Sequence, residues 1–116
     1  MAGFIKVADK DELKDGEMKQ VDVDGYAVLL ARAGDSYYAA AGRCPHLGGK
    51  LANGSLDGTI VTCPLHGSRF DLVDGRVVRW TNFTGFVATL NNLFKSSRPL
   101  PVYKVKIEND AVLVEL

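Results

Sequence analysis

Both cysteines and both histidines of this chain fall within two short loops of similar sequence, Cys44-Pro-His46 and Cys63-Pro-Leu-His66. The spacing reads C-x-H-x16-C-x2-H, so each loop offers one thiolate and one imidazole. A [2Fe–2S] cluster takes this donor set when one of its irons is held by two sulfurs and the other by two nitrogens. The pattern therefore predicts a centre that carries one electron at a time, with Cys44, His46, Cys63 and His66 as its metal ligands.

A single zinc ion could accept the same four ligands, which would make the chain a zinc-stabilised binding module. Zinc modules usually pair cysteine with cysteine and histidine with histidine along the sequence. Here each pair is mixed. The order of residue types therefore favours the iron–sulfur cluster, with zinc as the alternative.

The residues around the ligands indicate two stiff loops, 43–52 and 62–70. A proline follows each cysteine and restricts the backbone on both sides of the bond between them. Gly48, Gly49 and Gly67 would let backbone amides approach the sulfurs closely. Asn53-Gly54 and Asp57-Gly58 would reverse the chain between the loops. The residues expected to form an apolar patch around the histidines are Pro45, Leu47, Pro64 and Leu65.

The segments that must position these loops have strand patterns with glycine-rich turns between them. Strands are expected at residues 4–7, 18–23, 26–32, 36–40, 59–62, 70–73, 76–79, 102–107 and 111–115. Many short strands at close spacing predict an all-β fold, a small antiparallel sandwich or barrel. One stretch differs, because apolar residues at 86, 87, 90, 93 and 94 follow a helical period. A short inserted helix is therefore expected at about residues 85–95.

Length and composition indicate one domain, residues 1–116, with 47% apolar and 24% charged residues. The 14 basic and 14 acidic residues balance, which gives no general attraction to nucleic acid or anionic lipid. The charges are not evenly spread, since residues 1–24 hold seven acids and residues 69–106 hold seven bases. Neither a signal peptide nor a membrane anchor is recognisable, so the cytoplasm is the expected location.

The motifs C-P-H-L-G-G and C-P-L-H-G-S, with an Arg-Phe-Asp strand after the second, resemble those of the Rieske family. The similarity is greatest to the small ferredoxins that serve aromatic-ring-hydroxylating dioxygenases. The resemblance implies one [2Fe–2S] cluster, with Cys44 and Cys63 on the inner iron and His46 and His66 on the outer iron. It also implies transient contact with a flavin-dependent reductase and a terminal oxygenase.

The Rieske proteins of cytochrome bc complexes carry two further cysteines that cross-link the loops, and Gly49 and Leu65 stand at those positions here. In that branch a serine and a tyrosine donate hydrogen bonds to the cluster sulfurs. The matching residues are Ser68, which keeps the hydroxyl, and Phe70, which lacks it. The resemblance thus places Leu47, Gly48, Gly49, Gly67 and Ser68 around the cluster. Fewer donors predict a potential in the lower half of the Rieske range of about −150 to +300 mV.

We therefore expect a soluble electron carrier that is not an enzyme by itself and that passes electrons from a reductase to a terminal oxygenase. A second possibility is a detached Rieske domain or subunit of a larger oxidoreductase. The chain has no further histidine to build a catalytic iron site, which favours the carrier.

Overall fold

The computed structural model describes residues 3–45, 48–65, 67–79 and 99–116. Within these residues the chain forms ten β-strands and one 3-10 turn, so the all-β prediction is confirmed. The elements are β1 (Phe4–Asp9), β2 (Met18–Val23), β3 (Tyr26–Ala33), β4 (Ser36–Ala41), η1 (Leu51–Asn53), β5 (Ser55–Asp57), β6 (Ile60–Thr62), β7 (Arg69–Asp71), β8 (Val77–Arg79), β9 (Val102–Glu108) and β10 (Ala111–Glu115). The helix expected at residues 85–95 lies outside the described residues.

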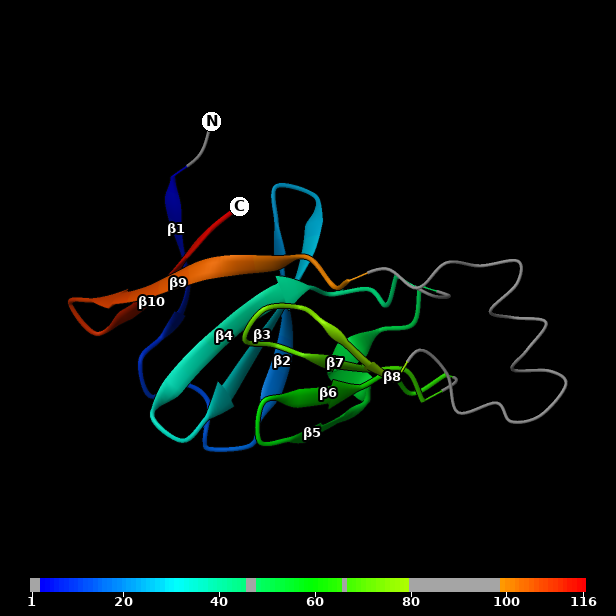
Figure 1. The fold of residues 1–116 in the computed structure, drawn as a ribbon. Helices are drawn as coiled ribbons and strands as arrows, with labels where there is room; N and C mark the ends of the chain where they lie inside the picture. Colours follow the sequence, from blue (N-terminus) through cyan, green and yellow to red (C-terminus); the bar gives the residue numbers. More distant parts are fainter. Residues whose placement is uncertain (1–2, 46–47, 66, 80–98) are drawn as a thin grey trace, which may run out of the picture.

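The larger sheet holds six antiparallel strands in the order β1-β10-β9-β4-β3-β2 (Figure 1). Its three hairpins lie where the turn sequences predict them. Asp24-Gly25 joins β2 to β3 with positive φ at both residues, and Gly34 begins the reversal from β3 to β4. Asn109 and Asp110 have positive φ between β9 and β10. Asn and Asp tolerate this left-handed region better than most residues, which explains their place in these turns.

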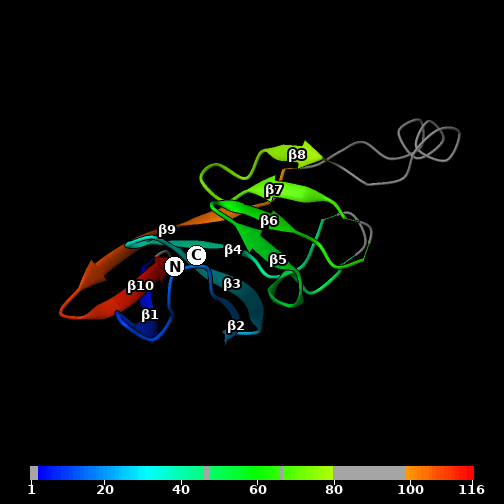
Figure 2. The same ribbon diagram turned by 90° about the horizontal axis from the view of Figure 1, so that it is seen from below.

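The smaller sheet holds four antiparallel strands in the order β5-β6-β7-β8. The reversal predicted at Asp57-Gly58 is confirmed, because β5 and β6 pair around Gly58, whose φ is +59°. The strand β5 itself was not predicted. In Figure 2 this sheet lies over the β3–β4 part of the larger sheet, and the described parts of the two loops (43–45 with 48–50, and 62–65 with 67–69) lie side by side at one end of the molecule.

The larger sheet curls, because its two edge strands bury side chains in the same core. Val7 of β1 and Val23 of β2 both belong to a cluster that also holds Val28 and Leu30 of β3 and Val112 of β10. Strands at opposite ends of the sheet order can share a core only when the sheet bends round toward closure. The predicted sandwich or barrel is therefore observed as a barrel-like sheet with a smaller sheet beside it.

A second cluster joins the two sheets. Leu29 of β3 alternates with Val28 and Leu30 along the strand, so it faces the opposite side of the larger sheet. There it packs in one cluster with Val61 of β6 and Phe70 of β7. Leu29, Val61 and Phe70 are fully buried. This cluster also contains both cysteines, so the core between the sheets supports the ends of the two loops.

Candidate metal centre

The first loop spans residues 43–50 and is closed at its base by an antiparallel bridge between Arg43 and Lys50. Two backbone hydrogen bonds fold it. The amide of Cys44 donates to the carbonyl of Gly49 at 2.9 Å, and the amide of Gly48 donates to the carbonyl of Cys44 at 2.8 Å. The cysteine is therefore fixed by its own backbone on both sides.

The second loop, residues 62–69, repeats this construction. Thr62 and Arg69 form the closing pair at the start of the β6–β7 ladder. The amide of Cys63 donates to the carbonyl of Ser68 at 2.8 Å, and the amide of Gly67 donates to the carbonyl of Cys63 at 3.2 Å. Each bond joins positions with the same separation as in the first loop. Two segments of different sequence thus hold their cysteines with the same pattern of backbone hydrogen bonds.

A glycine at the same position of each loop allows the two loops to share this hydrogen-bond pattern. Gly48 has φ +74° and Gly67 has φ +73°, four residues after Cys44 and Cys63 respectively. A side chain at a positive φ costs roughly 1–2 kcal/mol, so glycine is the residue that takes this turn without strain. These two glycines, predicted to bring the backbone close to the sulfurs, are needed for the fold of each loop.

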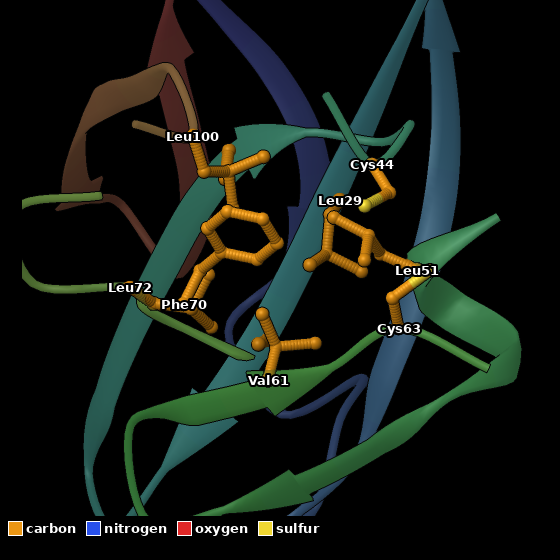
Figure 3. Close-up of a cluster of buried hydrophobic side chains, with 10 residues drawn as sticks. Leu29, Cys44, Leu51, Val61, Cys63, Phe70, Leu72 and Leu100 are labelled. Carbon is orange, nitrogen blue, oxygen red and sulfur yellow. The ribbon is translucent and has the colours of Figure 1, made fainter. Parts of the chain in front are cut away.

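Both cysteine side chains are buried at one end of the core between the sheets. Cys44 and Cys63 are each 3% exposed, and they belong to the same cluster as Leu29, Leu51 and Phe70. Figure 3 shows them on the side of this cluster near Leu51. The structure holds both as thiols rather than as a disulfide. Thiolates in such apolar surroundings need a positive partner, because burial penalises an isolated charge.

Gly49 of the first loop lies against the second loop. A Cβ atom at this position would stand 2.8 Å from Cys63 Sγ and 3.1 Å from two side-chain carbons of Leu65. Real Cβ atoms almost never come within 3.0 Å of another heavy atom. Glycine at 49 therefore gives the Cys63 sulfur its space. Positions 49 and 65, which the resemblance matches to a cross-linked pair, do face each other.

A second glycine sets the distance between the first loop and the strand that leads into the second. A Cβ on Gly54, directly after η1, would lie 1.9 Å from the carbonyl oxygen of Thr62. The turn is tied to the larger sheet, because the amide of Leu51 donates to Gly42 O at 3.0 Å and that of Gly42 to Ala27 O at 2.9 Å. Backbone contacts therefore place the Cys63 loop relative to the Cys44 loop.

Asp71 anchors the chain where it leaves the second loop. Its Oδ1 accepts hydrogen bonds from Thr59 Oγ1 and from the amide of Val73, each at 3.0 Å. Its Oδ2 pairs with Arg76 Nη2 at 3.3 Å. The carboxylate, 9% exposed, thus joins the start of β6 to the turn after β7. These contacts hold the two strands on which the second loop is mounted.

The described residues bring together most of the predicted site. Cys44, Gly48, Gly49, Cys63, Gly67 and Ser68 all lie in the two facing loops, and Ser68 is fully buried. His46, Leu47 and His66 lie outside the described residues. In the part of the chain that the structure describes, no group of three or more His, Cys, Asp or Glu side chains is placed to hold a metal ion.

Sequence reasoning gave Gly54 only a turn role and missed Leu51 and Asp71. The Asn-Gly pair at 53–54 signals a turn equally well whether or not another strand approaches it. Leu51 follows the glycine-rich loop without any periodic pattern, although it is fully buried. Asp71 carries one usable signal, the nearby Asp74-Gly75 turn, where a carboxylate often binds backbone amides.

Comparison with known proteins gives consistent matches over nearly the whole chain. The family model described as the Rieske [2Fe-2S] domain matches residues 3–103. The ferredoxin component of the naphthalene 1,2-dioxygenase/salicylate 5-hydroxylase systems of Ralstonia sp is 29% identical over 97% of this chain and 95% of its own length.

Two solved structures have the same fold. The ferredoxin of carbazole 1,9a-dioxygenase from Nocardioides aromaticivorans IC177 is 31% identical, with a TM-score of 0.77 over 96% of this chain and 95% of that chain. A chain in the complex of reduced oxygenase and oxidized ferredoxin of carbazole 1,9a-dioxygenase is 26% identical, with a TM-score of 0.77 over 95% of this chain and 99% of that chain.

Proposed function

This chain belongs to the Rieske [2Fe–2S] domain family, and we propose that it carries single electrons from a flavin-dependent reductase to a terminal oxygenase. The observation that carries the proposal is the pair of matched loops that bury Cys44 and Cys63 in one apolar cluster. The chain is an electron-transfer component rather than an enzyme, as are the ferredoxin components to which it is similar.

The family's cofactor is one [2Fe–2S] cluster, and the described residues fit it. Two buried cysteines on facing loops supply the sulfur donors that such a cluster needs, and Gly49 leaves room beside one of them. Cys44 and Cys63 would hold one iron, and His46 and His66 are the proposed ligands of the other. When bound, the cluster supplies a single redox step of one electron.

The protein around the site excludes water from the cysteines and keeps them in place. Leu29, Leu51 and Phe70 are fully buried beside Cys44 and Cys63, so the core reaches the sulfurs directly. The low polarity there strengthens each hydrogen bond and charge interaction that the loops make with the site. We propose Leu47, Gly48, Gly49, Gly67 and Ser68 as the residues around the cluster.

The second loop also offers a surface for partner contact. Leu65 is 55% exposed and Pro64 beside it is exposed, although both are apolar. A small apolar contact surface suits encounters between redox proteins, which bury little area and separate quickly. A related ferredoxin forms a complex with the oxygenase of carbazole 1,9a-dioxygenase, which supports an oxygenase as one partner. The flavin-dependent reductase is the partner we propose for the other side of the transfer.

The cytoplasm is the location that we propose, with residues 1–116 as one domain. Among the described residues, no helix has the length and hydrophobicity needed to cross a membrane. Similarity over 95% of the length of the Ralstonia ferredoxin component supports the carrier role. No role in nucleic-acid binding is proposed, because the formal net charge is zero.

A reconstituted electron-transfer assay tests this function. The purified protein, a flavin-dependent reductase, NADH and a ring-hydroxylating oxygenase are combined, and product is measured with each component omitted in turn. Omission of this chain should abolish turnover, and Cys63→Ser should do the same. Full turnover without the chain, or turnover by the chain and substrate without an oxygenase, would contradict the carrier role.

A further inference from the structure

The charges of this chain are divided between two parts of its sequence, although they cancel overall. Residues 36–107 contain nine bases and three acids, whereas residues 1–35 and 108–116 together contain five bases and eleven acids. No Asp or Glu occurs in residues 37–56 or 58–70, the segments that contain both loops. Both loops therefore lie in the basic part of the sequence.

Four carboxylates of the acidic part lie together at the end of the molecule away from the two loops. Asp9, Asp11, Glu12 and Asp110 line one hollow, together with Lys10. The hollow lies between the connection from β1 to β2 and the hairpin of β9 and β10. Figures 1 and 2 both place that hairpin and the two loops at opposite ends of the molecule. Asp9 and Glu12 pair with Lys6 and Lys19, so Asp11 and Asp110 are the two carboxylates of this hollow outside the ion pairs of the described residues.

The loop end carries three cations at the bases of the loops. Arg43 and Lys50 form the closing pair of the first loop, and Arg69 belongs to the closing pair of the second. Arg43 is exposed, and the other two are partly exposed. The three cations therefore lie at the bases of the two loops, and the second of these loops exposes Leu65.

The contacts of these cations leave their charges uncompensated. Arg69 Nε donates to Thr62 Oγ1 at 3.1 Å, and Arg43 Nη1 lies 3.5 Å from Gly48 O. Both acceptors are neutral. Across residues 3–45, 48–65, 67–79 and 99–116, the ion pairs involve other cations. The loop end therefore keeps its positive charge.

We propose that the loop end docks on an acidic surface of a partner redox protein, and that the charge separation turns this end toward the partner before contact. The inference rests on the proposed carrier function. The Debye length at physiological salt is about 8 Å, much less than the roughly 30 Å diameter of a small domain. A partner at the loop end therefore meets the local positive charge rather than the net charge of zero, which raises the rate of productive encounter.

Two small oxidants of opposite charge test the sign of this field on the holoprotein. Ferricyanide is a trianion and hexaammineruthenium(III) a trication, and both take one electron. Salt is raised from about 10 mM to about 300 mM, which shortens the Debye length from about 30 Å to below 8 Å. Oxidation of the reduced protein by ferricyanide should slow severalfold, and oxidation by hexaammineruthenium(III) should accelerate.

Two double variants with the same net charge show which end of the molecule produces the salt dependence. Arg43→Gln/Lys50→Gln removes two cations from the loop end, and Lys10→Gln/Lys14→Gln removes two exposed cations from the opposite part of the chain. The first variant should lose more than half of the salt dependence with ferricyanide. The second should keep the wild-type dependence. Equal loss in both variants would show a response to net charge and would overturn the proposal.

Cation-exchange chromatography gives a readout that does not depend on electron transfer. At a pH near the sequence value of 6.7, a chain with zero net charge but a basic end should still bind a sulfonate matrix. The Arg43→Gln/Lys50→Gln variant should elute at lower salt than Lys10→Gln/Lys14→Gln. Co-elution of the two variants, or a ferricyanide rate that rises with salt, contradicts the proposal. A colourless protein without iron would instead contradict the carrier function, while the elution order would still test the charge separation.

Discussion

Gly49 and Cys63 come from different loops, yet the space for the Cys63 sulfur exists only because residue 49 has no side chain. A Cβ atom at position 49 would lie 2.8 Å from Cys63 Sγ, inside the contact distance of real Cβ atoms. The amide hydrogen bond from Cys44 to the Gly49 carbonyl fixes this approach from the other side. The geometry of Cys63 thus depends on Gly49, which belongs to the other loop. Gly49 lies nineteen residues before the equivalent position in the loop of Cys63 itself.

Replacement of Gly49 by alanine should therefore reduce cluster content rather than only stability. The new methyl group must displace the Cys63 sulfur or Leu65, and iron and acid-labile sulfide per chain should fall severalfold. Gly3→Ala is a matched control, because nothing lies within 4 Å of a Cβ there and its φ is not positive. A Gly49→Ala protein with wild-type iron, sulfide and visible spectrum would show that the sulfur position tolerates the methyl group.

Gly54→Ala should destabilise the protein strongly, because its Cβ would lie 1.9 Å from a backbone oxygen that no side-chain rotation can move. We expect a loss of at least about 3 kcal/mol, at the upper limit of typical overpacking costs. Gly58→Ala is the comparison, since nothing lies within 4 Å of a Cβ there but φ is +59°. It should cost only the backbone strain of about 1–2 kcal/mol. Thermal unfolding at equal cluster content measures both, and similar melting temperatures would contradict the close approach.

Ser68→Ala should lower the midpoint potential of the cluster. A hydroxyl that donates toward the cluster stabilises its reduced, more negative form, and one hydrogen bond contributes about 1 kcal/mol. For one electron this corresponds to about 40 mV. Ser68 is fully buried in the second loop, whereas Ser55 is exposed and serves as the control site. Protein-film voltammetry measures the midpoint potentials of Ser68→Ala and Ser55→Ala. An unchanged potential in Ser68→Ala would show that this hydroxyl does not stabilise the reduced cluster.

Asp71→Asn should weaken the base of the second loop. The amide group keeps the shape of the carboxylate but turns one acceptor into a donor, which leaves Thr59, Val73 or Arg76 without a partner. The expected cost is about 1–3 kcal/mol. Asp74→Asn is the matched control, because Asp74 is exposed and accepts a hydrogen bond from the Arg76 amide at 3.0 Å. Equal melting temperatures for the two variants would contradict a supporting role for the Asp71 network.

The sequence was sufficient for the fold class, the hairpins and the two loops. Asp24-Gly25, Asp57-Gly58 and the turn at residues 108–110 each mark a local reversal, and local turns are set by the conformational preferences of the residues within them. The mixed order of cysteine and histidine also predicts an iron–sulfur site, because this order suits few chemistries. The pairing of Gly49 with Leu65 followed from the family resemblance and agrees with the structure.

Features that depend on distant contacts could not be read from the sequence. The strand β5 is three residues long and lies between two turn signals, so its pairing with β6 leaves almost no pattern of its own. The approach of Gly54 to Thr62 and the network of Asp71 exist only once β6 and β7 are placed beside η1. The position of Arg43, Lys50 and Arg69 relative to the hollow lined by Asp11 and Asp110 likewise depends on the path of the whole chain.

The most direct test of the central claim is elemental analysis with electron paramagnetic resonance of anaerobically purified protein labelled with 15N-histidine. Two irons and two acid-labile sulfides per chain are expected, with the unpaired electron of the reduced form coupled to two histidine nitrogens. Protein that contains zinc without sulfide, or a reduced cluster with no histidine coupling, would contradict the central claim.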